Sequence, residues 1–320
     1  MKTLVVAAGI AAGLAFGAPA MAQTKPTVAI IVKDTTAPYW QAVLAGARKA
    51  GQDLGVNVSE LGTQSETDAN GQIGILEKAV ASNPAAIVIA PAQSSALGRA
   101  IDEAAKKVKV IGIESAAGTK AMTSLLTTDN VQVGRIAAEA LAAAITKTYG
   151  DTEGNIVIIT SMPGIASLDQ RAKGFKEVLA AKYRALNIVA DKVADGKPMT
   201  VINLMKDLIV NTADLRGVFV SDPIMTQAVG QAVAESTSGD KINVIGVGSD
   251  EKLVKLLQSD TIAGLVVEDP FRMGYEGVKT ALAASKGEQV AATVDTGATL
   301  VTKANMSTAR SQELLNPKVK

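Results

Sequence analysis

Short apolar runs alternate with amphipathic stretches of helical length along almost the whole chain. The apolar runs are rich in Val and Ile, and their length of four to eight residues is typical of β-strands. They fall at 27–32, 56–61, 85–90, 109–113, 155–160, 186–193, 217–220, 243–247 and 263–267. Segments with helical periodicity lie between them, at 38–54, 66–82, 131–147, 169–183, 199–211, 223–236 and 271–286. Nearly continuous apolar strands that alternate with helices predict parallel sheets covered on both faces.

The stretch after the first apolar run carries the local signals of a helix. Pro38 suits the opening turn, because the N–H that proline lacks would have no partner there. Trp40, Val43 and Ala47 then recur at helical spacing and form one apolar face. Gly55 can adopt the left-handed conformation that ends a helix. These signals predict a helix between Pro38 and Gly55.

The alternating pattern forms two blocks, at about 27–127 and 155–267. A length of roughly 300 residues exceeds the usual size of one domain, and each block has enough strands for a doubly wound domain. A helix at 271–286 and a strand at 298–303 follow the second block, which suggests that the chain returns to the earlier domains. We predict an α/β protein with two similar doubly wound parallel-sheet domains.

Residues 1–22 have the layout of a secretory signal peptide. Lys2 precedes an apolar stretch from Leu4 to about Phe16, and a small-residue triplet ends at Ala22. We therefore expect cleavage near Ala22 and export to the periplasm. No later segment reaches the roughly 18 unbroken apolar residues that a membrane span requires.

The composition excludes several classes of function. Cleavage removes one of the 32 Lys and Arg residues, so the remaining basic residues equal the 31 Asp and Glu. A neutral chain lacks the basic surface that binds nucleic acid or an anionic membrane. There is no Cys and no His, which excludes disulfides, Cys or His metal sites, thiol nucleophiles and Ser-His-Asp triads. We expect no metal and no cofactor, and an enzyme here would depend on carboxylates, Lys or Tyr.

Parallel sheets bind ligands beyond the carboxyl ends of their strands, where loops lead into helices. The loops at this edge are 33–40, 91–96, 114–118, 161–171, 221–225, 248–251 and 268–271. Their polar candidates for ligand contacts are Lys33, Asp34, Gln93, Glu114, Arg171, Asp222, Asp250 and Glu268. The first loop also contains Tyr39 and the only tryptophan of the chain, Trp40. Solvated loops often carry acids, so the concurrence of these residues at one edge of both sheets is the informative part.

Eight segments carry a resemblance to a known family. They are "VKDTTAPYWQAVLAGARKAG", "AAIVIAPAQSSAL", "TDNVQVGRIAAEAL", "DQRAKGF", "GVFVSDPIMTQAVGQAV", "VIGVGSDEKLVKLL", "LVVEDPFRMGYEGVK" and "VDTGATLVTKANM". Each is a weak pattern alone. In this order and spacing they resemble the periplasmic solute-binding proteins of the ribose type, the exported receptors of ABC sugar importers, over essentially the whole mature chain.

The resemblance implies the type I fold of periplasmic binding proteins, with two lobes joined by three crossings that form a hinge. The crossings would fall at Thr128-Asp129, Glu268-Asp269 and Asp295-Thr296, with hinge residues Thr128, Asp129, Asp269 and Asp295. The N-terminal lobe would hold 23–128 and 269–295, and the C-terminal lobe 129–268 and 296–320. The ligand would bind in the cleft between the lobes, which closes over it.

The resemblance also implies how side chains hold the ligand. Tyr39 and Trp40 match an aromatic pair whose rings stack on the apolar C–H faces of a sugar. Glu114 matches an acid that grips adjacent hydroxyls. Arg171 matches an arginine whose planar fork donates to two hydroxyls at once. The alternative for both aromatic residues is a place in the hydrophobic core.

Some positions depart from the family. Asp222 matches the polar residue of a strand-end loop, while Glu268 stands where the family has a hinge-side glutamine. "GVGSD" replaces a common "GFD", so the acid of that loop is either lost at Gly248 or supplied by Asp250.

The charges of the cleft limit its ligand, because a buried charge has to be paired or neutralised. The acids Glu114, Asp222 and Glu268 outnumber the bases Lys33 and Arg171. We expect the cleft to reject phosphates and carboxylates and to accept a neutral polyhydroxyl ligand or one that carries an amine.

Other functions remain open at this stage. The main prediction is a monomer that captures a small sugar or polyol and delivers it to the permease of an ABC importer. A receptor that presents the sugar to a chemotaxis or sensor partner would use the same fold. Paired carboxylates across the cleft would also suit a glycosidase, although the other features match a binding protein. A sugar-responsive repressor would carry a DNA-binding segment where this chain has its signal peptide.

Overall fold

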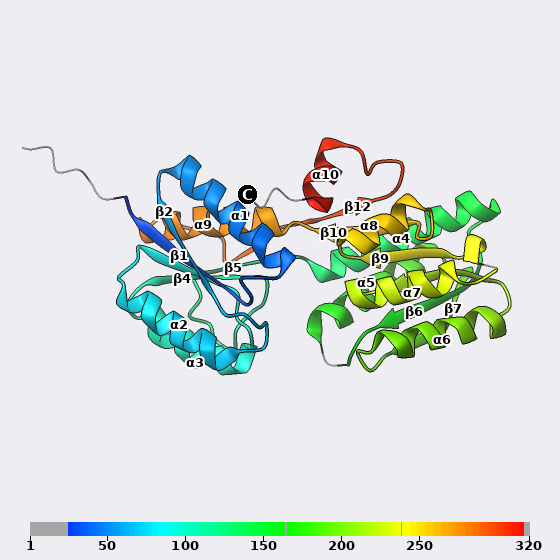
Figure 1. Ribbon diagram of the computed structural model, residues 1–320, viewed down its shortest axis with the longest axis horizontal. Helices are drawn as coiled ribbons and strands as arrows, with labels where there is room; N and C mark the ends of the chain where they lie inside the picture. The colour runs from blue at the N-terminus through cyan, green and yellow to red at the C-terminus, as the bar shows by residue number, and fades with distance from the viewer. Residues whose placement is uncertain (1–24, 164, 238, 317–320) are drawn as a thin grey trace, which may run out of the picture.

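The computed structural model describes residues 25–163, 165–237 and 239–316. Figure 1 shows two α/β bodies that lie side by side along the long axis and are joined near the middle. We call the body that contains the first strand the N-lobe and the other body the C-lobe. The predicted signal peptide, residues 1–22, lies outside the described residues.

The N-lobe is built on a parallel sheet with the strand order β11-β5-β4-β3-β1-β2. Its strands are β1 (Thr27–Val32), β2 (Asn57–Gly62), β3 (Ala86–Ile89), β4 (Lys109–Ile113), β5 (Ser124–Thr127) and β11 (Thr293–Asp295). Helices α1 (Pro38–Leu54) and α9 (Pro270–Ser285) pack on one face. Helices α2 (Ala69–Ala81) and α3 (Ser94–Ala105) pack on the other face.

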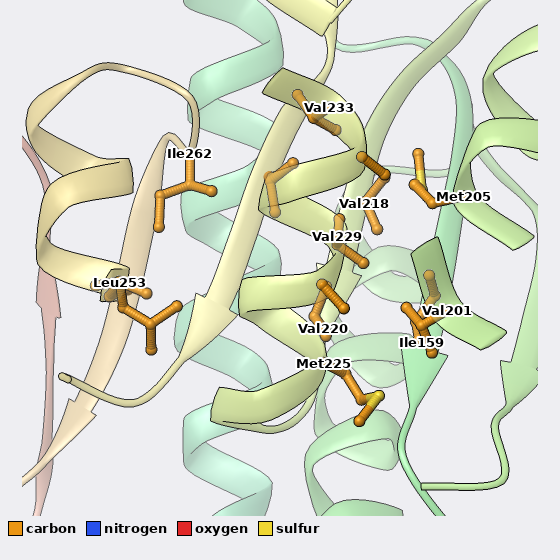
Figure 2. Packing of buried hydrophobic residues seen from close by; sticks show 14 of the residues in the cluster. Ile159, Val201, Met205, Val218, Val220, Met225, Val229, Val233, Leu253 and Ile262 are labelled. Carbon is orange, nitrogen blue, oxygen red and sulfur yellow. The ribbon is translucent and has the colours of Figure 1, made fainter. Parts of the chain in front are cut away.

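The C-lobe repeats this plan with the strand order β12-β10-β9-β8-β6-β7. Its strands are β6 (Gly154–Thr160), β7 (Leu186–Val193), β8 (Leu215–Val220), β9 (Asn243–Val247), β10 (Gly264–Glu268) and β12 (Ala298–Val301). Helices α4 (Asn130–Tyr149) and α5 (Ala166–Lys182) cover one face. The other face carries α6 (Pro198–Asn211), α7 (Pro223–Ala234), α8 (Glu251–Gln258) and α10 (Ala309–Leu315). Figure 2 shows the core on that face, where Val218 and Val220 of the sheet meet Met225 and Val229 of α7.

The chain crosses between the two lobes three times. It leaves β5 of the first sheet for α4, which packs against the second sheet. It returns from β10 to α9, which packs on α1 and on β3 and β4. It crosses again between β11 and β12, which belong to different sheets. Two doubly wound lobes joined by three crossings confirm the predicted fold class.

Most predicted elements have the expected bounds, and the misses have physical reasons. The sequence patterns predict no strand at β5 or β11, because four and three residues are too short for a clear alternation. β12 is predicted as a strand, but it runs antiparallel to β10 in an otherwise parallel sheet. A strand that enters directly from the hinge, without a crossover helix, is free to take this direction.

Glycines bring one pair of helices in each lobe unusually close together. In the C-lobe, a Cβ added to Gly134 of α4 would lie 1.9 Å from the Arg171 carbonyl oxygen, and one on Gly174 of α5 would lie 1.9 Å from that of Val131. Gly46 of α1 and Gly274 of α9 make the same kind of reciprocal contact in the N-lobe. Close packing of α4 and α5 therefore fixes the backbone that carries Arg171.

Candidate ligand-binding site

The N-lobe contributes a charged cluster at the carboxyl ends of β1 and β4. Lys33 Nζ donates to Glu114 Oε2 at 2.5 Å and to Ser115 Oγ at 3.0 Å. Ser115 Oγ also donates to the Glu114 carboxylate. The Glu114 side chain stays about one third exposed, so the cluster can still meet a ligand in the cleft. A paired carboxylate and ammonium offer one acceptor group and one donor group to sugar hydroxyls.

Glu114 has an unfavourable backbone conformation for a residue with a side chain. Its φ of 63° lies in the left-handed region. Two hydrogen bonds hold it there: Glu114 N–H donates to Leu126 O at 2.9 Å, and Thr127 Oγ1 donates to Glu114 O at 2.8 Å. Strain held in place by its surroundings often marks a binding site, which supports a functional role for this carboxylate.

The C-lobe contributes Arg171, which is 6% exposed and held by three acceptors. Its Nε donates to Asn130 Oδ1 at 2.7 Å, Nη1 to Ser221 O at 3.0 Å, and Nη2 to Glu268 Oε1 at 3.1 Å. A guanidinium has five N–H donors. One donor on each Nη therefore finds no acceptor among the described residues and is available to a ligand oxygen.

Charged side chains of both lobes affect the pKa of Tyr39. It lies at the start of α1 in the N-lobe, where its hydroxyl contacts Met273 Sδ at 3.8 Å. Partial burial, with the carboxylates of Glu268 and Glu114 nearby, raises the pKa of the Tyr39 phenol well above its ordinary value. The Arg171 charge acts on it in the opposite direction. The phenol is thus affected by charged groups of both lobes.

Asp222 is a buried acid whose carboxylate is only partly satisfied. It caps α7, where its Oδ1 accepts from Met225 N–H at 3.0 Å. Its Oδ2 is buried and has no hydrogen-bond partner among the described residues. Burial raises the pKa of the Asp222 carboxyl, against the opposing effects of the Met225 amide, the Ser161 hydroxyl and the Arg171 charge. A ligand hydroxyl would give this oxygen the donor that it lacks.

The structure corrects the expectation for Trp40. Its ring is 2% exposed and belongs to the core between α1, α9 and the first sheet. Its indole N–H donates to Glu66 Oε1 at 2.7 Å, and the Lys33 ammonium lies 5.6 Å from the ring centre. Trp40 therefore packs in the core of the N-lobe, whereas Tyr39 stays partly exposed.

Two further predicted contacts, Asp34 and Asp250, bind groups in their own loops and helices. Asp34 Oδ1 accepts from Thr36 and Ala37 and shapes the turn before α1, and the Thr36 hydroxyl above all lowers the pKa of Asp34. Asp250 caps α8 through Oδ1 and accepts from Gln227 through Oδ2. These geometries do not favour Asp34 and Asp250 as the principal ligand contacts.

Gln93 precedes α3 and its side chain is exposed. It makes no capping hydrogen bond to that helix, so its amide is available at the edge of the N-lobe. Its role as a ligand contact stays a prediction.

The first and third crossings are tied to each other. Asp295 Oδ1 accepts from the N–H groups of Asp129 at 3.0 Å and Gly297 at 2.8 Å. The hydroxyls of buried Thr128 and Thr296 lie 3.4 Å apart. These bonds hold two chain segments side by side at the junction of the lobes.

The second crossing is held by an acid between the lobes. Asp269 is buried and caps α9, where its Oδ1 accepts from Arg272 N–H at 2.9 Å. Its Oδ2 accepts from Nη2 of Arg310, on α10 of the C-lobe, at 2.5 Å. The assignment of Asp269, Thr128, Asp129 and Asp295 as hinge residues stays a prediction.

Two residues at the site escape the sequence analysis. Ser115 follows Glu114 in a loop at the edge already singled out, so its position could have suggested it. Asn130 gives no such signal, because only the fold brings the start of α4 to the side chain of Arg171. Within the described ranges, no group of three or more acids could hold a metal ion. No helix in the same ranges is long and apolar enough to cross a membrane.

A family model described as a periplasmic binding protein domain matches residues 28–289. The chain belongs to this family. The match includes both lobes and two of the three crossings, and it confirms the predicted resemblance.

Relatives of known name extend the match to nearly the full length. A ribose import binding protein from Salmonella typhimurium is 28% identical over 309 residues, which are 95% of this chain and 98% of the relative. A D-allose-binding periplasmic protein from Escherichia coli is 25% identical over 299 residues, 90% of this chain and 93% of the relative. These relatives are sugar-binding proteins, as the ribose-type resemblance predicts.

Solved structures that resemble this chain are also sugar-binding proteins. A carbohydrate transporter solute-binding protein from Agrobacterium radiobacter, in complex with D-arabinose, is 60% identical with a TM-score of 0.78, and the match covers 92% of this chain and 100% of that one. An ABC transporter solute-binding protein from Agrobacterium vitis, with bound D-fucose, is 29% identical with a TM-score of 0.73. That match covers 90% of this chain and 99% of the other.

Proposed function

We propose that this sugar-binding protein captures a neutral monosaccharide between its lobes, with D-arabinose as the first candidate, and delivers it to the permease of an ABC importer. The two uncommitted N–H groups of buried Arg171 carry the proposal. One of them is on Nη2, which also donates to Glu268. The charges of Arg171 and Glu268 both affect the pKa of Tyr39, which belongs to the other lobe. Paired donors and acceptors across a cleft are the groups that adjacent hydroxyls require.

The pairing of charges favours a neutral ligand over a cationic one. Lys33 pairs with Glu114, and Arg171 pairs with Glu268. The remaining acid, Asp222, has a raised pKa because it is buried, so its charge is disfavoured. A cleft with this balance offers no uncompensated charge strong enough to select an amine or a phosphate.

D-Arabinose is the first candidate because the relative that binds it is 60% identical over 92% of this chain. The relative with bound D-fucose, at 29% identity, makes this sugar a useful second probe. We further propose that the protein is a monomer, works in the periplasm after signal cleavage near Ala22, and catalyses no reaction. Its lobes would comprise 23–128 with 269–295 and 129–268 with 296–320, with the hinge at the three crossings.

Isothermal titration of the chain from residue 23 onward tests the proposal. D-Arabinose, L-arabinose, D-ribose and D-fucose serve as neutral probes, D-galactosamine as the cationic probe and D-arabinose 5-phosphate as the anionic probe. We expect a neutral pentose to bind with one site per chain and the phosphate not to bind. A ligand at 100 times its Kd should add about 2.7 kcal/mol to the free energy of unfolding, which gives an independent reading.

Arg171→Lys provides the matched variant for this titration. Lysine keeps the charge but has no planar fork, so affinity should fall at least about tenfold. Arg135→Lys is the control, because the exposed Arg135 pairs with Glu177 on the outside of α4 and α5. Binding of the amine or the phosphate alone, or full affinity in Arg171→Lys, would contradict the proposed site.

A further inference from the structure

The amide of Asn130 lies between the ligand-binding arginine and the hinge. Asn130 is the first residue of α4 and directly follows the first crossing between the lobes. Its Oδ1 accepts from Arg171 Nε at 2.7 Å, and its Nδ2 donates to Thr128 O at 3.2 Å. Arg171 can only donate and a carbonyl can only accept, so the two partners together fix the orientation of the amide.

Helix capping does not account for this side chain. Asp129 already caps α4, because its Oδ1 accepts from Gln132 N–H at 2.9 Å. The Asn130 amide therefore does not cap the helix, although capping is the usual role of a polar residue at a helix start. Both of its hydrogen bonds are to groups outside the helical backbone.

We propose that Asn130 is the positioning residue for Arg171 and ties it to the first hinge crossing, an inference that rests on the proposed sugar-binding function. By occupying Nε, Asn130 fixes the rotation of the guanidinium plane. Ser221 O and Glu268 then hold one N–H on each Nη. The two remaining N–H groups are left in a defined direction for the sugar hydroxyls.

The same amide connects the sugar site with the hinge. Its partner Thr128 is buried, and the Thr128 hydroxyl lies 3.4 Å from that of Thr296 on the third crossing. A second anchor of Arg171, Glu268, ends β10 at the second crossing. The arginine that grips the ligand is thus held by side chains at two crossings, so its alignment depends on the hinge.

Two substitutions separate the two bonds of Asn130. Asn130→Asp keeps an acceptor for Arg171 Nε but loses the donor to Thr128 O. Asn130→Ala loses both groups. Asn155→Ala is the control, because Asn155 Nδ2 donates to a backbone carbonyl, Ala213 O at 2.7 Å, at the start of β6. All three variants lose one bond to a backbone carbonyl, and Asn130→Ala also loses the bond to Arg171. A purely structural role therefore predicts lower thermal stability in each variant and no difference in sugar affinity.

D-Arabinose affinity, measured by titration calorimetry, is the first readout. We expect Asn130→Ala to weaken binding about tenfold or more, because Arg171 loses a charge-assisted partner and its fork is no longer aligned. Asn130→Asp should remain within about threefold of the native protein, since the acceptor is retained. Native affinity in Asn130→Ala, or equal weakening in both variants, would overturn the inference.

The second readout needs no sugar. The ¹⁵Nε–¹Hε signal of Arg171, identified by its loss in Arg171→Lys, reports the hydrogen bond to Asn130 directly. We expect it to shift and exchange faster with solvent in Asn130→Ala and to persist in Asn130→Asp. An unchanged signal in Asn130→Ala would overturn the positioning role. Failure of the native protein to bind any of the sugars, with the expected signals, would instead count against the proposed function alone.

Discussion

Trp40 occupies a sequence position that suggests a ligand contact, yet its side chain belongs to the hydrophobic core. Its position in the first turn of α1, directly after the loop from β1 and beside Tyr39, resembles that of the aromatic pair expected from the family. The α1 backbone nevertheless turns its ring inward, where it is 2% exposed. Loop position can be predicted from the sequence, but the direction of a side chain in the first turn depends on the packing of α1 against α9 and the sheet.

Trp40→Ala should therefore affect stability more than binding. Removal of a buried tryptophan costs about 3–5 kcal/mol of unfolding free energy, measured by urea denaturation. Tyr39→Ala, the neighbouring comparison, should cost less stability and more sugar affinity, because its ring is partly exposed. Sugar should leave the emission wavelength of native Trp40 nearly unchanged, since the indole is already shielded from water. If Trp40→Ala remains stable but no longer binds sugar, Trp40 contacts the ligand and its assignment to the core is wrong.

The raised pKa of Asp222 predicts how the stability of the protein depends on pH. Burial raises its folded-state pKa above the ordinary value of 3.8, so the folded protein binds this proton more tightly than the unfolded chain. Its contribution to stability is therefore full below that value and is lost as pH rises through the folded pKa. Asp222→Asn keeps an acceptor for the α7 cap and removes the buried charge. The variant should gain stability over the native protein at pH 7, and less at pH 4, in paired thermal melts.

Asp53→Asn is the opposite control for that experiment. The hydrogen bond from Lys49 lowers the pKa of exposed Asp53, so its contribution to stability is present at neutral pH and lost in acid. This variant should lose a little stability at pH 7. An Asp222→Asn protein less stable than the native one at pH 7 would show that the native surroundings favour the charged carboxylate.

At the scale of elements, the close contact of α4 with α5 sets the position of Arg171. Gly134→Ala would place a Cβ 1.9 Å from the Arg171 carbonyl oxygen, so the helices have to separate. Such overpacking costs roughly 1–3 kcal/mol of unfolding free energy. We also expect weaker sugar binding, because α5 carries the arginine away from Asn130 and Glu268. Chemical denaturation and calorimetry on one preparation measure both effects.

Gly74→Ala is the matched glycine control, because a Cβ at this position in α2 meets no atom within 4 Å. Alanine favours the helix over glycine, so this variant should gain about 0.5–1 kcal/mol and keep its affinity. If Gly134→Ala behaves like Gly74→Ala, then the helix contact does not position Arg171.

The elements themselves were largely predictable, and the site was predictable only in part. β1, β4, β7, β9 and α1 have the predicted bounds, because apolar runs and helix-end signals are local. The strand-end loops likewise indicated Glu114 and Arg171. The bond between Asn130 and Arg171 joins residues 41 positions apart, so no local pattern could indicate it. The antiparallel pairing of β12 is equally a consequence of the hinge.

For the whole molecule, sugar capture between the lobes requires that they move about the three crossings. The bonds among Asp129, Asp295, Thr128 and Thr296 hold two crossings together. The Asp269–Arg310 pair links α9 of the N-lobe to α10 of the C-lobe outside the cleft. Arg171 and Glu114 lie on different lobes, so one sugar can meet both only if it binds between them. Binding should then favour the arrangement in which the lobes are closer.

Small-angle X-ray scattering with and without saturating D-arabinose tests this central claim most directly. We expect the radius of gyration of the native protein to decrease when the sugar is added, while the mass stays that of a monomer. Arg171→Lys at the same sugar concentration should show little or no decrease. A native protein that binds the sugar by calorimetry, yet keeps the same radius of gyration, would contradict binding between lobes that close.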